Sequence, residues 1–440
     1  MKKLLTTMTM LLALGQSAFA QFGNCTPSER YEYKDKQTGV TIIGLTDTTK
    51  NDRFMYQTDP MWTPDGKYLL FRSSSRGDGK EQETVGRDGK KRKYRPTNYF
   101  FIDLETGKII QATDGKEGGV FLGNKSNKFY YNRREDGKWS LYEMNLDAFF
   151  ADVKAGKCKK QKNYERFIGT FPAEMGRPGG MAINSDDTYA FISVERDGTE
   201  EEKERMNKNA FIPLSDQPIK IKPVLSGLRK MNLQTGEVTK IADVEFKVGH
   251  IQSSRFNPDE IVFCNETGGD AAQRMWYAKS DGSVVKPLYK ETPLDWVTHE
   301  TFASRDYVYF NILGFQPRLR KQASGILRIN LRNNDVELLG QVEMNADGDQ
   351  LRGRGFWHCN ATRDDKWSAG DTFAGSVWLI NNETGQRHHI ATETRMRPDH
   401  SHPAFSPDCK KMIFQSGHFT NGKRLNLMMV DLTKQAFWGK

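Results

Sequence analysis

The chain has 440 residues, of which 37% are hydrophobic and 28% are charged, and its formal net charge is +9. This composition excludes an intrinsically disordered chain, and 26 Phe, 15 Tyr and 8 Trp residues can fill a sizeable core. The positive charge is compatible with an acidic partner, but Lys and Arg are scattered along the sequence, which on charge alone favours a solvated basic surface. No nucleic-acid-binding motif accompanies them, so we expect no nucleic-acid partner.

The first 20 residues have the pattern of a secretory signal peptide. Lys2 and Lys3 precede the apolar run Met8 to Leu14, and Ala18-Phe19-Ala20 is a small-x-small cleavage pattern. The run is too short to span a bilayer, and no later segment is apolar enough to do so. We therefore expect a secreted or periplasmic protein without a membrane partner; a retained signal anchor is the alternative.

The mature chain, residues 21–440, repeats one unit seven times. Each unit has an anchor with Asp or its neighbours followed by a short β-rich run, as in Thr63-Pro64-Asp65-Gly66 before residues 68–71. The other anchors lie at residues 124–127, 185–187, 257–259, 304–306, 363–365 and 406–408. A strand, a polar turn and another strand complete the unit, most clearly at residues 100–110, which is the signature of a hairpin.

Seven four-stranded units at a spacing of roughly 45–70 residues predict an all-β fold, a seven-bladed β-propeller. A single blade cannot bury both of its faces, so the blades must stack around an axis. The charged segments 74–96 and 196–223 are predicted to be insertions. The second is consistent with a short helix, a lid over the channel or a solvated loop.

Five cysteines are widely spaced and include no C-x-x-C pair, which argues against a zinc knot. One disulfide is possible in an oxidising compartment, but the sequence does not pair the cysteines. Cys264 follows the apolar residues 261–263, which predicts a buried free thiol.

Five of the eight histidines lie just upstream of the anchors. His402 and His358 precede an anchor Asp by six residues, His299 by seven, His400 by eight and His250 by nine. The segment before each anchor should be the innermost strand, which lines the channel, so these side chains should meet near one end. His400 and His402 are two residues apart, so on a strand they would share a face.

A cluster of imidazoles with an open coordination position suits Mn, Zn, Ni or Cu. Asp399, Glu300 and Arg397 are adjacent in sequence to these histidines and are candidates for an oxygen ligand, a supporting carboxylate and a carboxylate clamp. The remaining histidines, His388, His389 and His418, fall in or after outer strands and are predicted to lie at the surface.

Several stretches resemble the oligogalacturonate lyase family. They are residues 248–264 with Gln273-Arg274-Met275-Trp276, Thr298-His299-Glu300, and residues 399–408, and a weaker resemblance covers most of the mature chain. The resemblance implies a seven-bladed propeller with Mn²⁺ at one end of its channel and cleavage of short galacturonides by β-elimination. It also implies that His299, His400 and His402 are metal ligands, that His250 is catalytic and that Arg274 lies near the substrate.

Two positions depart from the family pattern. The family has a glutamine ligand three residues before the His-x-His pair, where this chain has Arg397, and an arginine does not ligate a metal. A water molecule, Asp399 or the substrate would then supply the fourth metal ligand. The family's arginine base falls on Gly227, and Arg229, two residues on, is the candidate to replace it.

The resemblance implies an acidic oligosaccharide substrate whose C5 proton is removed while a metal or arginine offsets the adjacent carboxylate. His250 is the candidate base or acid and Arg229 the second candidate base. Arg274 or Arg397 would clamp a carboxylate, and His358 either contacts the substrate or fills the channel. Trp357, like Trp296 and Phe356, either stacks on a sugar or packs in the core.

Two other functions remain open from the sequence. A glycoside hydrolase would need paired carboxylates facing the channel, and Glu300 with Asp399 is the obvious pair. A non-catalytic propeller that binds a glycan or a protein is the third reading, because fold alone does not exclude it.

Overall fold

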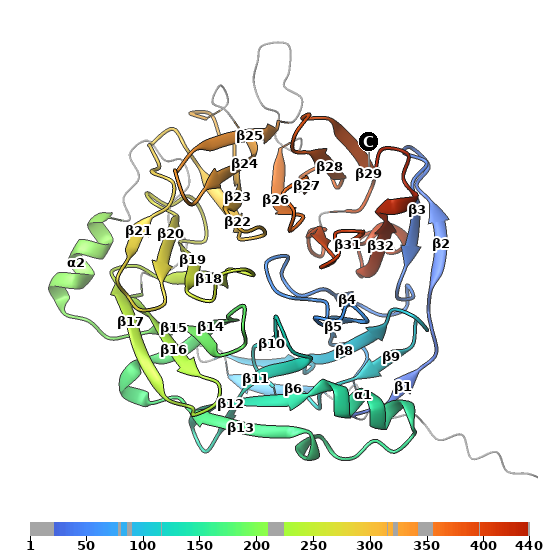
Figure 1. Cartoon of the computed structure of the whole chain (residues 1–440), viewed down its shortest axis with the longest axis horizontal. Helices are drawn as coiled ribbons and strands as arrows, with labels where there is room; N and C mark the ends of the chain where they lie inside the picture. Colours follow the sequence, from blue (N-terminus) through green and yellow to red (C-terminus); the bar gives the residue numbers. More distant parts are fainter. Residues whose placement is uncertain are drawn as a thin grey trace, which may run out of the picture.

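The computed structural model describes residues 22–77, 81–85, 90–115, 117–209, 224–314, 316–319, 324–341, 355–395 and 397–438. Its strands form seven sheets in a ring, which confirms the predicted seven-bladed β-propeller (Figure 1). The predicted signal peptide lies outside the described residues. Within them, no helix has both the length and the apolar character needed to cross a membrane.

Each blade is an antiparallel sheet that runs from an inner strand beside the axis to an outer strand at the rim. Blades one and two contain β4 (Asp52–Arg53), β5 (Tyr68–Ser73), β8 (Asn98–Asp103) and β9 (Ile109–Gln111), then β10 (Val120–Leu122), β11 (Lys128–Glu135), β12 (Lys138–Asn145) and β13 (Glu165–Thr170). Blades three and four contain β14 (Arg177–Ile183), β15 (Tyr189–Glu195), β16 (Ser226–Asn232) and β17 (Val238–Val244), then β18 (Val248–Ser253), β19 (Glu260–Asn265), β20 (Met275–Lys279) and β21 (Val285–Pro287).

Blades five and six contain β22 (Val297–Thr301), β23 (Tyr307–Ile312), β24 (Gly325–Asn330) and β25 (Val336–Gly340), then β26 (Phe356–Ala361), β27 (Trp367–Thr372), β28 (Val377–Asn381) and β29 (Arg387–Ala391). Blade seven contains β30 (Ala404–Phe405), β31 (Lys411–Ser416) and β32 (Asn426–Asp431). Short 3-10 helices lie at Gln161–Asn163, Ala173–Met175, His418–Thr420 and Leu432–Lys434.

The segment before blade one closes the ring. Its strand β3 (Thr41–Gly44) pairs with β32 and carries β2 (Tyr31–Lys34) on its outer edge, so both ends of the chain build blade seven. Strand β1 (Cys25–Thr26) instead pairs with β9 of blade one. The same segment therefore joins the first blade to the last.

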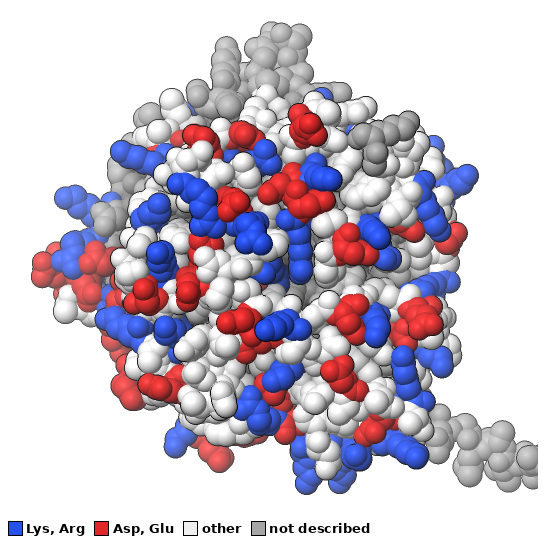
Figure 2. Space-filling model, in the orientation of Figure 1, with Lys and Arg blue, Asp and Glu red and all other residues white. Residues whose placement is uncertain are grey.

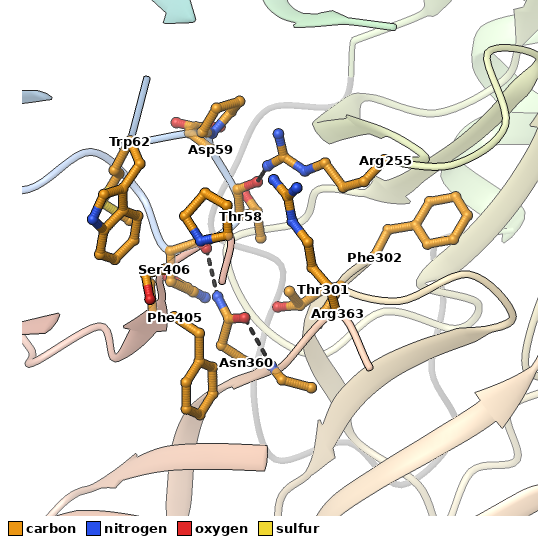
Figure 3. A pocket seen from close by; sticks show the side chains of 17 residues that line it. Thr58, Asp59, Trp62, Arg255, Thr301, Phe302, Asn360, Arg363, Phe405 and Ser406 are labelled. Atoms are coloured by element: carbon orange, nitrogen blue, oxygen red, sulfur yellow. Dashed lines mark hydrogen bonds between the residues drawn. The ribbon is translucent and has the colours of Figure 1, made fainter. Parts of the chain in front are cut away.

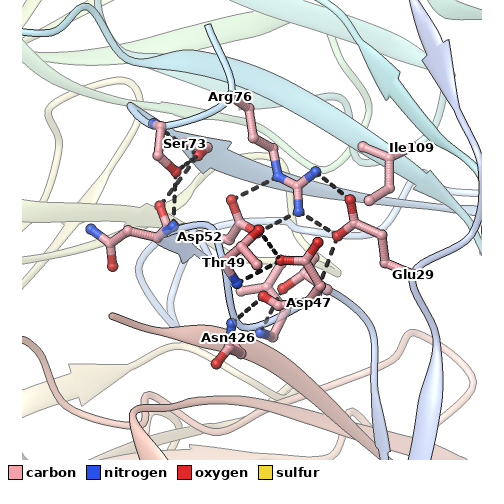
Figure 4. Close-up of polar contacts among 12 residues, drawn as sticks. Glu29, Asp47, Thr49, Asp52, Ser73, Arg76, Ile109 and Asn426 are labelled. Atoms are coloured by element: carbon pink, nitrogen blue, oxygen red, sulfur yellow. Dashed lines mark hydrogen bonds and ion pairs between the residues drawn. The ribbon is translucent and has the colours of Figure 1, made fainter. Parts of the chain in front are cut away.

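A buried ion-pair cluster fixes this junction (Figure 4). Arg76 donates to both carboxylate oxygens of Glu29, at 2.9 and 2.6 Å, and to both of Asp52, at 2.8 and 2.7 Å. Asn426 of blade seven donates to the backbone carbonyl of Asp47. Two bidentate pairs on one guanidinium hold the N-terminal segment against the first strand of blade one.

The hydrophobic core lies between neighbouring blades. Phe71, Phe101 and Phe129 are fully buried in one cluster shared by blades one and two. Helix α1 (Leu146–Lys154) covers this cluster, with the ring of Phe150 stacked 3.7 Å from that of Tyr68. The sequence pattern did not predict α1, which begins where the Asn145 side chain accepts a hydrogen bond from the backbone N–H of Ala148.

The two predicted insertions have different structures. Segment 74–96 contains the hairpin β6 (Gln82–Val85) and β7 (Lys91–Tyr94). Segment 196–223 contains helix α2 (Glu200–Asn209), and residues 210–223 lie outside the described residues. Because α2 lies at the outer rim in Figure 1, the short-helix alternative is confirmed for its described part and α2 does not cover the channel.

Figure 2 shows Lys and Arg dispersed among Asp and Glu on this face of the ring, as the scattered sequence positions suggested. All five cysteines are free thiols, and Cys264 is buried as predicted. The described structure thus contains no disulfide.

Candidate metal centre

Four histidines from blades five, six and seven meet beside the axis. The ring centroid of His358 lies 4.0 Å from that of His402, 4.3 Å from that of His299 and 5.1 Å from that of His400. His400 and His402 are 6.2 Å apart. Imidazoles that bind one ion at about 2.1 Å would have centroids about 4.5–5.2 Å apart. The observed separations of 4.0 to 6.2 Å lie on both sides of this range, so the rings are close enough to share an ion after small rotations.

His250 of blade four reaches the same cluster through Tyr56. The Tyr56 ring lies 4.8 Å from His250, 5.3 Å from His402 and 5.9 Å from His358. All five histidines that precede an anchor therefore converge, as their spacing predicted. Tyr56 was not predicted, although it lies nine residues before Asp65, the same spacing as His250 before Asp259.

Irregular backbone aims these rings at one another. The pairing of the inner strands shifts register between Gly249 and Gln252, between Thr298 and Thr301, and between Phe356 and His358. The residues His250, His299 and His402 have φ of 44°, 54° and 48°, in the left-handed region. Such bulges redirect side chains and occur beside functional sites, whereas a positive φ at a non-glycine residue costs free energy that the surroundings must offset.

His400 and His402 differ in one respect from the prediction that they share a strand face. Both precede β30, which begins at Ala404, so they lie in an irregular segment. The left-handed backbone at His402 turns its ring toward His358, and the Trp357 ring stacks 5.5 Å from His400. The two imidazoles still meet in the cluster, but through this turn and not through strand alternation.

Asp371, on β27, fixes the centre of the cluster. Both of its carboxylate oxygens lie 3.1 Å from Nδ1 of His358, and they accept backbone hydrogen bonds from His358, Ser401 and His402 at 2.9, 2.9 and 3.0 Å. Burial alone would raise the pKa of Asp371, but His358 and the neighbouring histidines hold it well below its usual range. The carboxylate therefore orients His358 by Nδ1 and leaves its Nε2 free to face the other rings.

The remaining ring nitrogens have few protein partners. Nδ1 of His402 lies 2.8 Å from Oε1 of Gln57, and its Nε2 lies 3.3 Å from Oδ1 of Asp399. Nδ1 of His299 lies 2.9 Å from the Thr298 hydroxyl. Nδ1 of His400 is buried without a hydrogen-bond partner in the described structure, so this nitrogen is available to a ligand.

Burial lowers the pKa of all four clustered histidines, His299, His358, His400 and His402. The imidazoles are therefore neutral near pH 7, which is the form that binds a metal. The ligand atoms of His358, Asp371 and His400 also lie within 4.8 Å of one another. The donor set, its protonation and the orphaned His400 nitrogen all fit a divalent ion.

A chain of charged groups runs beside the cluster in blades four and five. Nε2 of His250 lies 3.2 Å from Oε2 of Glu266, and the guanidinium of Arg274 lies 3.8 Å from the same oxygen. Burial alone would raise the pKa of Glu266, but His250 and Arg274 lower it to about 2. Arg274 also donates to Glu300 at 2.9 Å, and both side chains are buried.

This pairing bears on two sequence predictions. Arg274 lies near the cluster, but its guanidinium is held by Glu266 and Glu300 and is almost inaccessible. Glu300 is fully buried against Arg274, whereas Asp399 is partly exposed beside His402 and Arg53. Glu300 is therefore an internal counter-ion to Arg274, which does not favour its pairing with Asp399 as in a glycoside hydrolase.

Arg229 does not join the cluster. It lies on β16, the third strand from the axis, and donates to the backbone carbonyls of Met175, Leu228 and Ala242. It also forms an ion pair with Asp243 at 2.8 Å. These contacts hold the Arg229 guanidinium among blade-three groups and Met175, away from the histidine cluster, so the structure does not favour a catalytic base at this position.

Arg397 is exposed. Burial is the main cause of the lowered pKa of His400, and the positive charge of Arg397 makes a smaller contribution in the same direction. Of the histidines predicted at the surface, His388 and His389 are half-buried on β29, where they stack on Phe437 and Trp378 at 4.0 and 4.2 Å. His418 is also half-buried, stacked on Tyr33. These three rings pack on aromatic side chains at the rim and are separate from the cluster.

Residues 179–435, which carry all five converging histidines, match a family described as oligogalacturonate lyase. The chain belongs to the oligogalacturonate lyase family. It is 24% identical to the oligogalacturonate lyase of Dickeya dadantii over 409 residues, which cover 88% of this chain and 92% of that one. It is 23% identical to the oligogalacturonide lyase of Pectobacterium atrosepticum over 417 residues, 90% of this chain and 94% of that one.

A solved structure of an oligogalacturonate lyase in complex with manganese has the same fold. It is 21% identical in sequence, has a TM-score of 0.69, and the match covers 94% of this chain and 99% of that chain. A crystal structure of the oligogalacturonate lyase from Vibrio parahaemolyticus is 19% identical, with a TM-score of 0.68 over 93% and 98% of the two chains. The family match therefore covers residues 179–435, and the propeller fold extends over nearly the whole chain.

Proposed function

We propose that this protein is a metal-dependent lyase that cleaves oligogalacturonides by β-elimination. The observation that carries the proposal is the convergence of four neutral imidazoles from three blades, in a chain of the oligogalacturonate lyase family. The relatives from Dickeya dadantii and Pectobacterium atrosepticum are named for this activity. The manganese in the similar solved structure supports Mn²⁺ as the ion.

His299, His400 and His402 would hold the ion. His358 is the fourth candidate donor, since Asp371 holds its Nδ1 and its ring lies among the other three. It would supply the ligand that Arg397 does not. A bound divalent ion would act as a Lewis acid that offsets the charge of the substrate carboxylate beside C5.

His250 is the proposed base. Glu266 accepts from Nε2 of His250, which keeps the proton on that nitrogen and leaves Nδ1 as the acceptor. The His250 side chain is 30% exposed, so it is accessible to a substrate at the cluster. Its position beside the clustered rings allows proton removal from C5 while the leaving oxygen departs from C4.

Arg397 is the proposed substrate-binding arginine. It is exposed and carries its charge near His400, whereas Arg274 is held by Glu266 and by the buried Glu300. A free guanidinium at the mouth of the site can bind a uronate carboxylate in a bidentate manner. Trp357, packed against His299 and His400, is the nearest indole to the same site.

We also propose that the enzyme acts outside the cytoplasm, on the basis of the signal-peptide pattern in residues 1–20. Expression of the full chain in a bacterial host, followed by fractionation and N-terminal sequencing, tests this. A periplasmic product that begins at Gln21 supports it, and a cytoplasmic product that retains residues 1–20 contradicts it.

The activity itself is tested with purified protein, oligogalacturonides and Mn²⁺. The expected result is an ultraviolet absorbance increase from the unsaturated product, which a chelator abolishes and added Mn²⁺ restores. New reducing ends without that absorbance would indicate a glycoside hydrolase instead. Binding of oligogalacturonides without any product would indicate a non-catalytic propeller.

A further inference from the structure

A cavity lies among the inner segments of the blades (Figure 3), and one of its lining residues, Gln57, contacts the ring of His402. Its volume is about 60 Å³. Its walls come from the inner segments of blades one, four, five, six and seven, and include Gln57, Arg255, Thr301, Asn360 and Ala404. Thr301, Asn360 and Ala404 each lie two residues beyond a clustered histidine, so the cavity is about one strand repeat, roughly 7 Å, deeper in the channel.

Two arginines face this cavity. Arg255 follows β18 in blade four and Arg363 follows β26 in blade six, and Figure 3 shows their guanidinium groups directed toward one another. Arg255 is anchored, since it donates to the side chain of Asn124 and, at 3.0 Å, to the carbonyl of Thr58. Within the described residues, the Arg363 guanidinium has no hydrogen bond or ion pair to a protein group.

The charges of this pair are not balanced. Burial and the neighbouring charge of Arg363 lower the pKa of Arg255 to about 9, and burial lowers the pKa of Arg363. Asp59 is the one acid among the described residues that line the cavity, and burial raises its pKa to about 6. Arg255 and Arg363 are half-buried cations, and Asp59 is the one acid beside them among the described residues lining the cavity, so the cavity carries a net positive charge. Burying this charge costs free energy unless another group neutralises it.

We propose that this cavity binds a small oxyanion between Arg255 and Arg363. A planar guanidinium presents N–H donors as a fork that matches two oxygens of a carboxylate, phosphate or sulfate. A single water needs about 10–15 Å³, so the cavity has room for several waters or one such anion. The bound anion neutralises the arginine pair and ties blade four to blade six beneath the histidines.

This site is separate from the proposed lyase site. Gln57 and Asn360 stand between them: Gln57 bonds the ring of His402 on one side, and Asn360 donates to the backbone carbonyl of Gln57 at 2.7 Å. The anion therefore acts on the stability of the inner strands and is not a substrate. Its binding is measurable on protein that holds neither metal nor uronide, so its failure and that of the lyase proposal are distinguishable.

The test compares thermal unfolding of metal-free protein at constant ionic strength, with chloride replaced by sulfate, phosphate, acetate or galacturonate. For wild type, we expect Tm to rise by about 2–5 °C and to saturate with at least one of these oxyanions. Saturation by sulfate or phosphate alone identifies an inorganic anion, and saturation by acetate or galacturonate alone identifies a carboxylate. A Tm that changes equally with every anion, chloride included, or without saturation, overturns the proposal.

The variant R363Q gives the sharper result, because it removes the charge that lacks a partner. We expect it to have a higher Tm than wild type in chloride and no further rise with the oxyanion. R363K, which keeps the charge but loses the fork, should bind several-fold more weakly. R134Q makes the same change at an exposed arginine on β11 of blade two, and its Tm should rise with the oxyanion as that of wild type does.

Isothermal titration with inorganic phosphate or sulfate provides a second measurement. One anion per chain for wild type and R134Q, with at least a tenfold weaker affinity for R363Q, supports the site. If R363Q binds the anion as tightly as wild type, or if its Tm rises equally with the oxyanion, the arginine pair does not form an anion site.

Discussion

The carboxylate of Asp371 lies 3.1 Å from the ring nitrogen Nδ1 of His358, and through this contact the second strand of blade six orients the centre of the histidine cluster. The same carboxylate accepts the backbone N–H groups of Ser401 and His402. One buried side chain therefore sets both the ring of one proposed ligand and the backbone that carries another.

We predict that D371N weakens metal binding by about 10–100-fold, because the amide orients His358 less firmly and makes its ring a poorer donor. Competition with a chelator of known affinity measures the dissociation constant for Mn²⁺. D364N, an exposed Asp in the anchor of the same blade, is the matched control. An unchanged dissociation constant for D371N would show that His358 is not oriented by this contact for metal binding.

Replacement of His299 by Ala should remove the ion. We expect the metal content of purified H299A to fall well below one ion per chain, while circular dichroism retains the β-sheet signal. H388A changes a histidine that stacks on Phe437 at the rim and should keep the full metal content. Equal metal content in the two variants would place the ion elsewhere.

H250A tests the proposed base. We expect kcat to fall by about 10²–10⁴-fold with metal content unchanged, because general-base catalysis contributes a factor of this size. Steady-state rates of unsaturated product formation, together with metal analysis of the same sample, measure both quantities. A variant with wild-type kcat would exclude His250 from proton removal.

Arg229 gives the opposite expectation. R229Q removes the ion pair between the buried Arg229 and the partly exposed Asp243, so we expect the free energy of unfolding to fall by about 1–3 kcal/mol. The folded fraction should retain its kcat and metal content, because the guanidinium contacts blade-three groups and Met175. D243N, which removes the other partner, should give a similar stability loss, and a specific loss of kcat in R229Q alone would restore a catalytic role.

The pH dependence of stability should report on Glu266. Its pKa is 4.5 as a free side chain and about 2 in the fold, so the carboxylate stabilises the protein above pH 4.5 and this stabilisation is lost as pH falls toward 2. Urea unfolding of wild type and E266Q at pH 7, 5, 4 and 3 measures it. The difference in unfolding free energy should be at most about 3 kcal/mol at pH 7 and shrink with acid, and a constant difference would contradict the assignment.

The sequence was informative where a residue's position follows from the repeat. The spacing of His250, His299 and His358 from their anchors placed them on inner strands, and inner strands meet at the axis. Tyr56 has the same nine-residue spacing from its anchor as His250, and it lies beside the same cluster. The seven-bladed fold followed from the same repeat.

The sequence was uninformative where a position depends on contacts between blades. Asp371 lies on a second strand and reaches the cluster only because blade seven brings its backbone N–H groups there. Arg229 lies away from the cluster because strand alternation indicates which face a side chain takes, not whether that face borders the channel. The positive φ angles at His250, His299 and His402 could not be predicted either, because a histidine does not by itself mark a left-handed backbone.

The pairing of β3 with β32 gives the proposed ion a place in the order of folding. Blade seven carries His400 and His402, yet its sheet is complete only when residues 41–44, from near the start of the chain, dock on residues 426–431 from near its end. A strand from the N-terminal segment must therefore wait for the last strand of the chain before the blade that carries two of the four imidazoles is complete. We therefore expect that removal of β3 or of β32 would loosen the blade that carries His400 and His402 and so weaken binding of the proposed ion.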